Sequence, residues 1–313
     1  MSSTPADNTT LPLQPSGWSA LPPEYAIPDV PPTLAEAQEY CRKLATSHYE
    51  NFPVVTWFLP QHLHQHFYNV YAYCRISDDL GDEVGDKQQS LLLLDQWESE
   101  LTRCYDGEPR HPVFVALRET VQEFGIPRHE FSDLLQAFRQ DQIVTRYPRF
   151  SDLLGYCQYS ANPVGHLVLY LCGYNDPERQ KLSDFTCTAL QLANFWQDVA
   201  VDFEKSRIYL PLEDFARFGV TEQDLADKRA TQQFLAMMKF EVERAREWFH
   251  RGLPLAKKVD RRLALDIELF SRGGLAILHA IERQNFDVLK SRPVISKRRK
   301  VLLLARAALG RLL

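Results

Sequence analysis

Two stretches of the sequence carry pairs of aspartates at helical spacing. "YAYCRISDDLGDE" contains Asp78 and Asp82 and follows an apolar and aromatic run. "QLANFWQDVAVDFEKSRIYLP" contains Asp198 and Asp202 at the same spacing. Side chains four residues apart lie one above the other on a helix, and two like charges at this spacing repel each other. Both stretches therefore need a positive charge nearby.

Each pair continues a longer polar stripe on its helix. Tyr71 and Arg75 lie upstream of the first pair, and Gln191 and Asn194 lie upstream of the second, at spacings of three or four residues. The neighbouring residues are mostly apolar, so we expect both helices and their stripes to be largely buried. A buried carboxylate pair costs free energy unless an opposite charge compensates it.

A divalent cation between the two helices would supply that compensation. The stripes offer only oxygen donors, and such hard donors favour Mg²⁺, with Mn²⁺ as an alternative. Mg²⁺ takes one or two protein carboxylates, keeps waters and bridges to substrate phosphates. We therefore expect an anionic phosphate substrate. The predicted metal ligands are Asp78, Asp82, Asn194, Asp198 and Asp202.

Two other interpretations of the acidic stretches stay open. An acidic helix end is often only a solvated face, although the repeated stripe with its aligned Asn argues against this here. A di-iron carboxylate bundle requires two Glu-x-x-His motifs. Glu247 and His250 form the only such motif within a predicted helix, and it lies outside both stripes.

The elements that must position these stripes are helices. Thr33 and Glu36 form a capping box at the start of a helical pattern, and no convincing strand alternation follows. Breaks with Pro, Gly or Asn separate the further helical patterns. These patterns cover residues 61–83, 87–106, 111–124, 128–143, 150–172, 178–203, 221–250, 253–260 and 262–289. The sequence predicts an all-α fold of about ten helices.

The chain divides into three parts. Residues 1–32 hold eight of the nineteen prolines and little periodic pattern, which predicts a disordered or loosely attached leader. Residues 33–289 form the helical domain. Residues 290–313 form a basic tail with eight Lys or Arg and no acidic residue, whereas the rest of the chain has 28 basic and 41 acidic side chains.

The tail suggests contact with a membrane. "SKRRKVLLLARAALGRLL", from Ser296 to Leu313, mixes cationic residues with a leucine-rich face, which is typical of a helix at an anionic surface. The alternative is that Val301–Leu313 packs on the body. We see no signal peptide, no apolar run that could span a bilayer and no C-x-x-C motif. We expect a cytoplasmic protein, peripheral to the inner face of the membrane, with no nucleic-acid partner.

The order and spacing of these motifs resemble the squalene/phytoene synthase family, the head-to-head prenyl synthases. The match runs from about residue 38 to 289 and includes both D-x-x-x-D motifs, the overlapping N-x-x-x-D and the trailing RIYLP. The resemblance implies that residues 33–289 form an isoprenoid synthase domain around a central active-site cavity. It also implies that two farnesyl-type diphosphates join to presqualene diphosphate, which then ionises and rearranges.

The resemblance assigns roles to single residues. It gives the metal sites to the stripe residues named above. It places Tyr71 and Arg75 at the diphosphate and Tyr156 beside the reacting carbons. It gives substrate contacts to His48, Phe52, Gln191 and Arg207. Arginines can donate charge-assisted hydrogen bonds to a diphosphate, and aromatic faces attract a carbocation in a dry cavity.

Departures from the family pattern resemble one subgroup, the bacterial hopanoid-pathway hydroxysqualene synthases. They are Asn162 and Pro163 in "SANPVG", Gln197 in "FWQD", and "ENFPV" at Glu50–Val54. Such enzymes ionise presqualene diphosphate and quench the rearranged cation with water, without NADPH. The alternative is a squalene or presqualene diphosphate synthase that condenses two farnesyl diphosphates. The third hypothesis is a non-catalytic, membrane-binding helical scaffold.

Asn162 is the predicted host of the quenching water. An amide donates and accepts hydrogen bonds without a charge, and a buried water needs about two to four polar partners. Pro163 cannot donate a backbone hydrogen bond and disfavours helix at the residue before it, so we expect a local break here. The alternative is that Asn162 only caps the helix that begins at Pro163.

Overall fold

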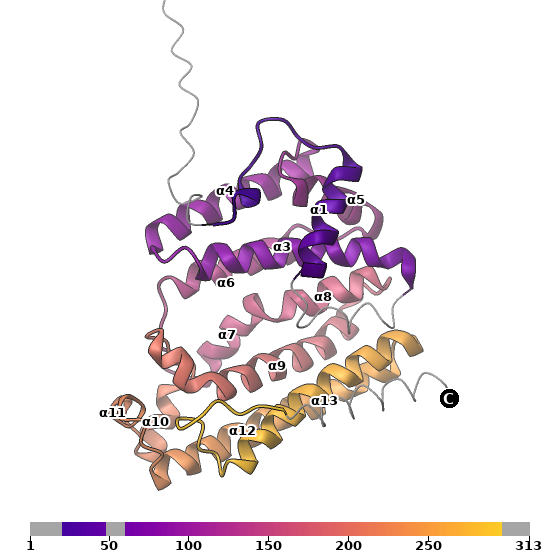
Figure 1. Cartoon of the computed structure of the whole chain (residues 1–313). Helices are drawn as coiled ribbons and strands as arrows, with labels where there is room; N and C mark the ends of the chain where they lie inside the picture. The colour runs from indigo at the N-terminus through magenta and orange to yellow at the C-terminus, as the bar shows by residue number, and fades with distance from the viewer. Residues whose placement is uncertain (1–20, 48–59, 296–313) are drawn as a thin grey trace, which may run out of the picture.

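The computed structural model describes residues 21–47 and 60–295, and within these ranges the chain is all-α (Figure 1). No described residue belongs to a strand, which confirms the predicted fold class. The helices are η2 (Pro23–Tyr25), α1 (Leu34–Ser47), η3 (Gln61–Leu63), α3 (His64–Asp82), α4 (Lys87–Asp106), α5 (Pro112–Phe124), α6 (His129–Asp141), α7 (Phe150–Ser160), α8 (Asn162–Leu171), α9 (Pro177–Glu204), α10 (Leu212–Phe218), α11 (Glu222–Ala226), α12 (Gln232–Gly252), η4 (Leu253–Lys257) and α13 (Arg261–Arg283).

The helices stack in successive layers, as Figure 1 shows. α1 packs on α3 and α5, and α3 packs on α6 and α8. α9 lies between α8 on one side and α12 and α13 on the other. The two helices that carry the acidic stripes, α3 and α9, are therefore inner members of the stack.

Aromatic side chains fix the orientation of α3 and α9. Tyr73 of α3 stacks on Trp97, whose indole N–H donates to Ser77 at 3.0 Å. Trp196 of α9 is fully buried and donates to the backbone carbonyl of Glu241 in α12 at 3.1 Å. Burying an apolar side chain of this size stabilises the fold by roughly 1.5–3 kcal/mol. Each helix is thus anchored by one face and leaves its polar stripe on another.

The helix expected over residues 150–172 is broken at Ala161. Ala161 donates its N–H to the carbonyl of Cys157 at the end of α7, and α8 starts at Asn162 with Pro163 in its first turn. Proline lacks an N–H and clashes with the preceding turn of a helix, so α7 cannot continue into α8. The break predicted at this point is confirmed.

Other helix bounds differ from the prediction. The helix expected over 262–289 ends at Arg283, and Asn285 and Phe286 beyond it have φ of 52° and 65°, values outside the helical region. The helix expected over 221–250 is two helices, α11 and α12, because Thr231 starts α12 by accepting from the N–H of Phe234. α10 was not predicted.

Part of the predicted leader packs on the domain. Leu21 and Tyr25 are buried, and the Tyr25 hydroxyl donates to Asp79 at 2.7 Å. The prediction of a loosely attached leader therefore does not hold for residues 21–32. The rest of the leader and the tail from Ser296 lie outside the described residues. None of the described helices is long and apolar enough to cross a membrane.

Candidate active site

The ends of α3 and α9 meet at an ion pair. Arg207, just beyond α9, donates from both Nη atoms to Oδ1 of Asp82, each at 3.1 Å. Lys205 Nζ lies 3.8 Å from the other oxygen of Asp82. Burial, then the charge of Asp198 and more weakly that of Asp82, raises the pKa of Asp202 to about 7. The structure therefore brings the two aspartate motifs together.

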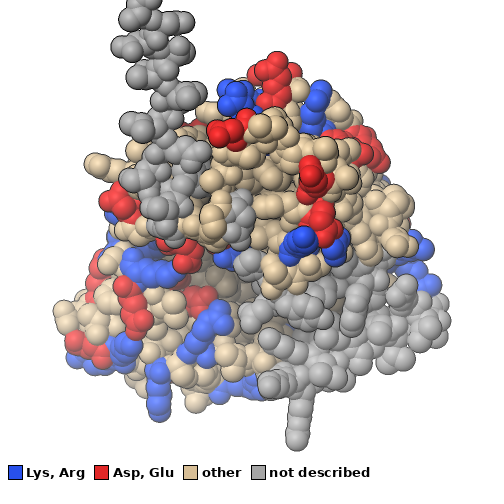
Figure 2. Space-filling model, turned by 45° about the horizontal axis from the view of Figure 1, so that its top comes forward, with Lys and Arg blue, Asp and Glu red and all other residues tan. Residues whose placement is uncertain are grey.

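Solvent reaches these side chains more freely than expected. Asp78, Asp82 and Asn194 are exposed, and Asp198 and Asp202 are half-buried. The expectation of buried stripes is wrong for Asp78, Asp82 and Asn194, because α3 and α9 bury their other faces and leave these side chains open. Figure 2 shows acidic and basic side chains interspersed on the face that it draws. An ion or a phosphate can thus reach the carboxylates from solvent.

The carboxylates of the two motifs crowd one another. Although the residue is exposed, neighbouring groups displace much of the water around its carboxylate; this desolvation, and next the charge of Asp82, raises the pKa of Asp78 to about 6. A bound cation would favour the ionised forms of such groups, and oxygen donors of this kind fit Mg²⁺. In residues 21–47 and 60–295, no three His, Cys, Asp or Glu lie close enough to hold a metal by themselves. A Mg²⁺ that uses one or two carboxylates, waters and a phosphate does not need such a cluster.

Asp198 is held by a residue that the sequence did not single out. Arg292 donates from Nε to Oδ1 of Asp198 and from Nη2 to Oδ2, the latter at 3.0 Å. Gln197 fixes the same segment: its Nε2 donates to the carbonyl of Pro293 at 2.5 Å, and its Oε1 accepts from Arg292 at 3.3 Å. The contact joins residues 94 positions apart. The only sign of this contact in the sequence is the excess of basic residues after residue 289. From the sequence alone, these residues are interpreted as a membrane-binding tail.

Arg75 is oriented by an aspartate beside the first stripe. Its Nε donates to Oδ2 of Asp79 at 3.1 Å, and its Nη2 donates to Oδ1. Tyr25 donates to Oδ2 of the same carboxylate. Asp79 is buried, so these contacts satisfy it and hold the guanidinium near the end of α3. Sequence reasoning missed this role of Asp79, because its position off the stripe gives no sign of the partner.

Tyr156 lies in a buried aromatic cluster next to an acid. Its hydroxyl donates to Oδ2 of Asp141 at 2.7 Å, and the Tyr209 hydroxyl donates to Oδ1 at 3.3 Å. The rings of Tyr209 and Phe195 stack with centroids 3.9 Å apart. Burial raises the pKa of Asp141 to about 6, although the two hydrogen bonds and the charge of Arg207 act to lower it. Asp141 therefore connects Tyr156 to the side of the site that contains Arg207.

An apolar cavity of about 320 Å³ begins next to the first stripe. Tyr71 and Cys74 of α3 line this cavity. Tyr71 lies one helical turn before Arg75 and Cys74 immediately before it. The other walls come from α8, α9, η4 and α13, with side chains such as Val164 and Leu190. A mostly apolar space beside charged groups suits a ligand that joins a hydrocarbon chain to an anionic head.

Asn162 is buried at the first turn of α8 and faces α9. Its Oδ1 accepts a hydrogen bond from Thr188 at 3.1 Å. This bond goes to a side chain of another helix, so the structure does not show the capping alternative. Asn162 is not among the residues that line the cavity. Gln191 is half-buried on α9, whereas His48 and Phe52 lie outside the described residues.

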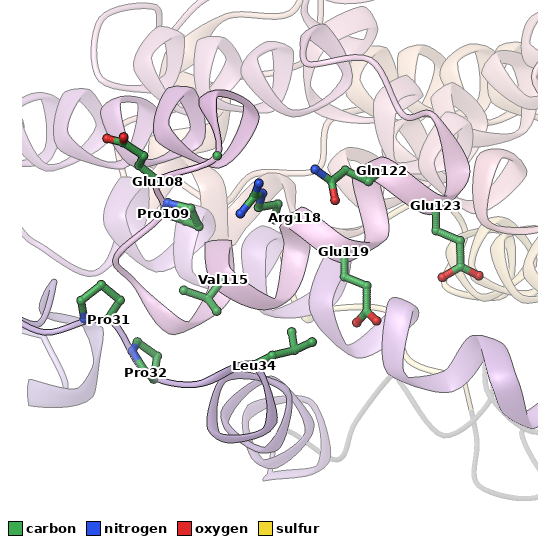
Figure 3. A pocket seen from close by; sticks show the side chains of 11 residues that line it. Pro31, Pro32, Leu34, Glu108, Pro109, Val115, Arg118, Glu119, Gln122 and Glu123 are labelled. Carbon is green, nitrogen blue, oxygen red and sulfur yellow. The ribbon is translucent and has the colours of Figure 1, made fainter.

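A larger hollow of about 900 Å³ lies between the segment Pro31–Leu34 and α5. Figure 3 shows its side chains, which come from that segment, from the α4–α5 connection and from α5. Two of its acids already have partners, since Glu119 accepts from Gln38 at 2.7 Å and Glu123 lies 3.3 Å from His66. None of the predicted site residues lines it, so it is not the candidate site.

Comparison with known proteins gives a consistent set of relatives. Residues 45–299 match the family described as squalene/phytoene synthase. The 15-cis-phytoene synthase of Synechococcus elongatus is 31% identical over 287 residues, covering 86% of this chain and 91% of that protein. The solved squalene synthase HpnC from Alicyclobacillus acidocaldarius is 44% identical with a TM-score of 0.78, covering 87% of this chain and 99% of that one. A dehydrosqualene synthase solved with a ligand is 26% identical with a TM-score of 0.79, covering 88% and 96%.

Proposed function

Because the chain belongs to the squalene/phytoene synthase family, whose members act on prenyl diphosphates, we propose that it is a Mg²⁺-dependent hydroxysqualene synthase. It would ionise presqualene diphosphate and quench the rearranged carbocation with water, giving hydroxysqualene and diphosphate for bacterial hopanoid biosynthesis. One observation carries the proposal: Cys74 of α3, one helical turn before Asp78, and Leu190 of α9, two turns before Asp198, line the same apolar cavity. The 44% identity to the solved squalene synthase HpnC supports an activity related to squalene formation.

The two acidic stripes would hold the metal. Mg²⁺, with Mn²⁺ as the alternative, acts as a Lewis acid that stabilises a leaving diphosphate when it is bound. The donor set supports this assignment, since it consists of carboxylates and one amide. The residues that would hold the ion are Asp78, Asp82, Asn194, Asp198 and Asp202.

The protein supplies positive charge of its own. Arg207 and Arg75 lie on the two sides of the aspartate motifs, held by Asp82 and Asp79. A guanidinium can turn from a carboxylate to a phosphate and donate two parallel hydrogen bonds to it. Tyr71, one turn before Arg75, belongs to the cavity wall. The diphosphate and the start of the prenyl chain would therefore meet at this turn of α3.

The cavity protects the carbocation. Its apolar walls exclude bulk water, and the faces of aromatic side chains such as Tyr71 and Phe270 attract a cation. Water can then act only where polar groups hold it. The sequence predicts Asn162 as the host of that water, but its buried amide oxygen already accepts from Thr188 and Asn162 is not among the residues that line the cavity.

A second candidate function has its own support. The curated relatives above include a phytoene synthase at 31% identity, and the relative at 44% identity is called a squalene synthase. Both names fit a synthase that condenses two prenyl diphosphates. The paired aspartates and the cavity are common to both candidates, so these features do not separate them. The hypothesis of a non-catalytic scaffold gains no support, because a scaffold has no use for the paired aspartates of this site.

Product analysis separates the candidates. The purified chain is incubated with Mg²⁺ and either presqualene or farnesyl diphosphate, with and without NADPH. The products are then identified by mass spectrometry. We expect an alcohol from presqualene diphosphate that needs no NADPH. Squalene that forms only with NADPH, or presqualene diphosphate made from farnesyl diphosphate, would instead establish the condensing enzyme.

A further inference from the structure

The cavity beside the first stripe is lined by an acid that has no partner among the described residues. Asp266 of α13 is 2% exposed and lines the cavity, and neither carboxyl oxygen has a hydrogen-bond partner in the described part of the chain. Thr186 on α9 lines the same cavity, and its hydroxyl is likewise buried and unpaired among the described residues. Most of the remaining lining is hydrocarbon, from side chains such as Leu263, Ile267 and Phe270.

The other deeply buried acids of this chain show how unusual Asp266 is. Glu241 is fully buried and accepts from Arg244 at 3.2 Å, and Asp214 accepts from the same arginine at 2.8 Å. A buried polar group without a partner is unfavourable because its desolvation is not compensated, and such groups are uncommon in native proteins. An unpaired acid that lines a cavity therefore indicates a ligand that pairs with it.

The partner of Asp266 must be small and polar. A prenyl chain is a hydrocarbon, so it can neither donate to the carboxyl group nor accept from it. A water molecule can donate to Asp266 and accept from the hydroxyl of Thr186. Tyr71 of α3 lines the same cavity as Asp266, so a water held there lies within the space that prenyl chains would enter.

We propose that Asp266, together with Thr186, holds the water that quenches the carbocation and takes up its proton, an inference that rests on the proposed function. The diphosphate has by then left with the electron pair of its C–O bond. The water oxygen forms the new C–O bond with a lone pair, one of its O–H bonds breaks, and the proton passes to a carboxylate oxygen of Asp266. The acid returns this proton to solvent once the alcohol has left.

The surroundings of Asp266 suit this role. Burial, and to a lesser extent Asp260, raises the pKa of Asp266 to about 8, and a general base is most effective when its pKa lies near the working pH. The water must lie between the acid and the cation, since direct contact would give an ester. Both oxygens of Asp266 are free of described partners, whereas Oδ1 of Asn162 already accepts from Thr188.

Product ratios in ¹⁸O-labelled water test the proposal. Wild type, Asp266→Asn, Asp266→Leu and Thr186→Val are incubated with presqualene diphosphate and Mg²⁺. We expect all four to consume the substrate, because ionisation depends on other residues. The ratio of labelled alcohol to eliminated hydrocarbon should fall by about 10²-fold in the two Asp266 variants, the scale of losing a general base, and less in Thr186→Val. Asp266→Asn is nearly isosteric and decides the matter if the leucine variant does not fold.

Thermal unfolding separates this role from a structural one. Removing an unpaired buried acid should raise Tm by roughly 2–4 °C in Asp266→Leu. The matched controls are Ser271→Ala, which removes an unpaired hydroxyl of α13 that does not line the cavity, and Glu241→Gln, which alters a paired buried acid. Both should keep the wild-type product ratio.

The possible outcomes distinguish the two proposals. If wild type makes no ¹⁸O-labelled alcohol from presqualene diphosphate in labelled water, the proposed function is wrong and the inference fails with it. If wild type makes labelled alcohol and both Asp266 variants make the same fraction, only the inference is wrong. A lower Tm with an unchanged ratio would likewise show that Asp266 is structural.

Discussion

His166 of α8 lies between two carboxylates and should make stability depend on pH. Nδ1 lies 3.0 Å from Glu130 Oε2, and Nε2 lies 2.7 Å from Asp184 Oδ1. Burial acts to lower the pKa of His166, but the hydrogen bonds to Asp184 and Glu130 and their charges outweigh it and raise the pKa from 6.5 to about 9. The His166 side chain is 18% exposed, so solvent screens the interaction only in part.

The size and sign of the effect follow from these two pKa values. Their difference corresponds to about 3 kcal/mol of unfolding free energy. Because the folded-state pKa is the higher one, this stability is fully present below pH 6.5 and is lost as the pH rises through about 9. The imidazolium must be present for both carboxylates to stay paired.

Urea unfolding at a series of pH values measures this contribution. His166→Gln keeps a polar side chain but cannot carry the charge. We expect the variant to be less stable than wild type by about 3 kcal/mol below pH 6.5, with the difference shrinking towards pH 9. Other groups titrate in both proteins, so their effects cancel in the difference. His279→Gln is the control, because the His279–Glu282 pair is 46% and 27% exposed and should contribute little. A difference that does not change with pH would refute the assigned charge of His166.

Three further predictions concern the site and the tail. Asp78→Asn and Asp198→Asn should each lower turnover by at least about 10²-fold, the scale of losing one electrostatic group, without a change in the circular dichroism spectrum. EDTA should stop turnover by the wild type, and normal turnover in either variant would contradict the metal assignment. Tyr156→Phe should lower the unfolding free energy in urea by about 1–3 kcal/mol, because it leaves Asp141 without its 2.7 Å hydrogen bond; equal stability would show that this bond contributes nothing. A chain that ends at Ile295 should lose binding to anionic vesicles at about 1 kcal/mol per missing basic residue near the surface; equal co-sedimentation of both forms would exclude the membrane role of the tail.

The sequence predicts those features that depend on local spacing. The stripes of α3 and α9 follow from residues three and four apart, and the break at Ala161 follows from Pro163. The exposure of the stripes does not follow in the same way, because periodicity shows that residues share a face and not which face the neighbouring helices cover. The apolar residues around Asp78 suggested burial, but they belong to the other faces of α3.

Contacts between distant residues explain most of what was missed. Nothing near Asp79 in the sequence indicates Tyr25, which is 54 residues away. Asp266 is different, since its signal was available. In "RRLALDIELF" this acid lies three residues after Leu263 and four before Phe270, on one apolar face. Only the structure shows that the face lines a cavity and that no described residue pairs with the acid.

The segment that follows α13 changes how Gln197 is understood. From the sequence, Gln197 was only a departure from the family pattern. In the structure this amide binds both the carbonyl of Pro293 and the guanidinium of Arg292, and Arg292 in turn pairs with Asp198. The positive charge beside the second motif therefore comes from the C-terminal segment. Because Arg292 donates to both carboxylate oxygens of Asp198, a metal on Asp198 would have to share these oxygens with the guanidinium or displace it. The position of this segment and the charge of the site are thus coupled through one side chain.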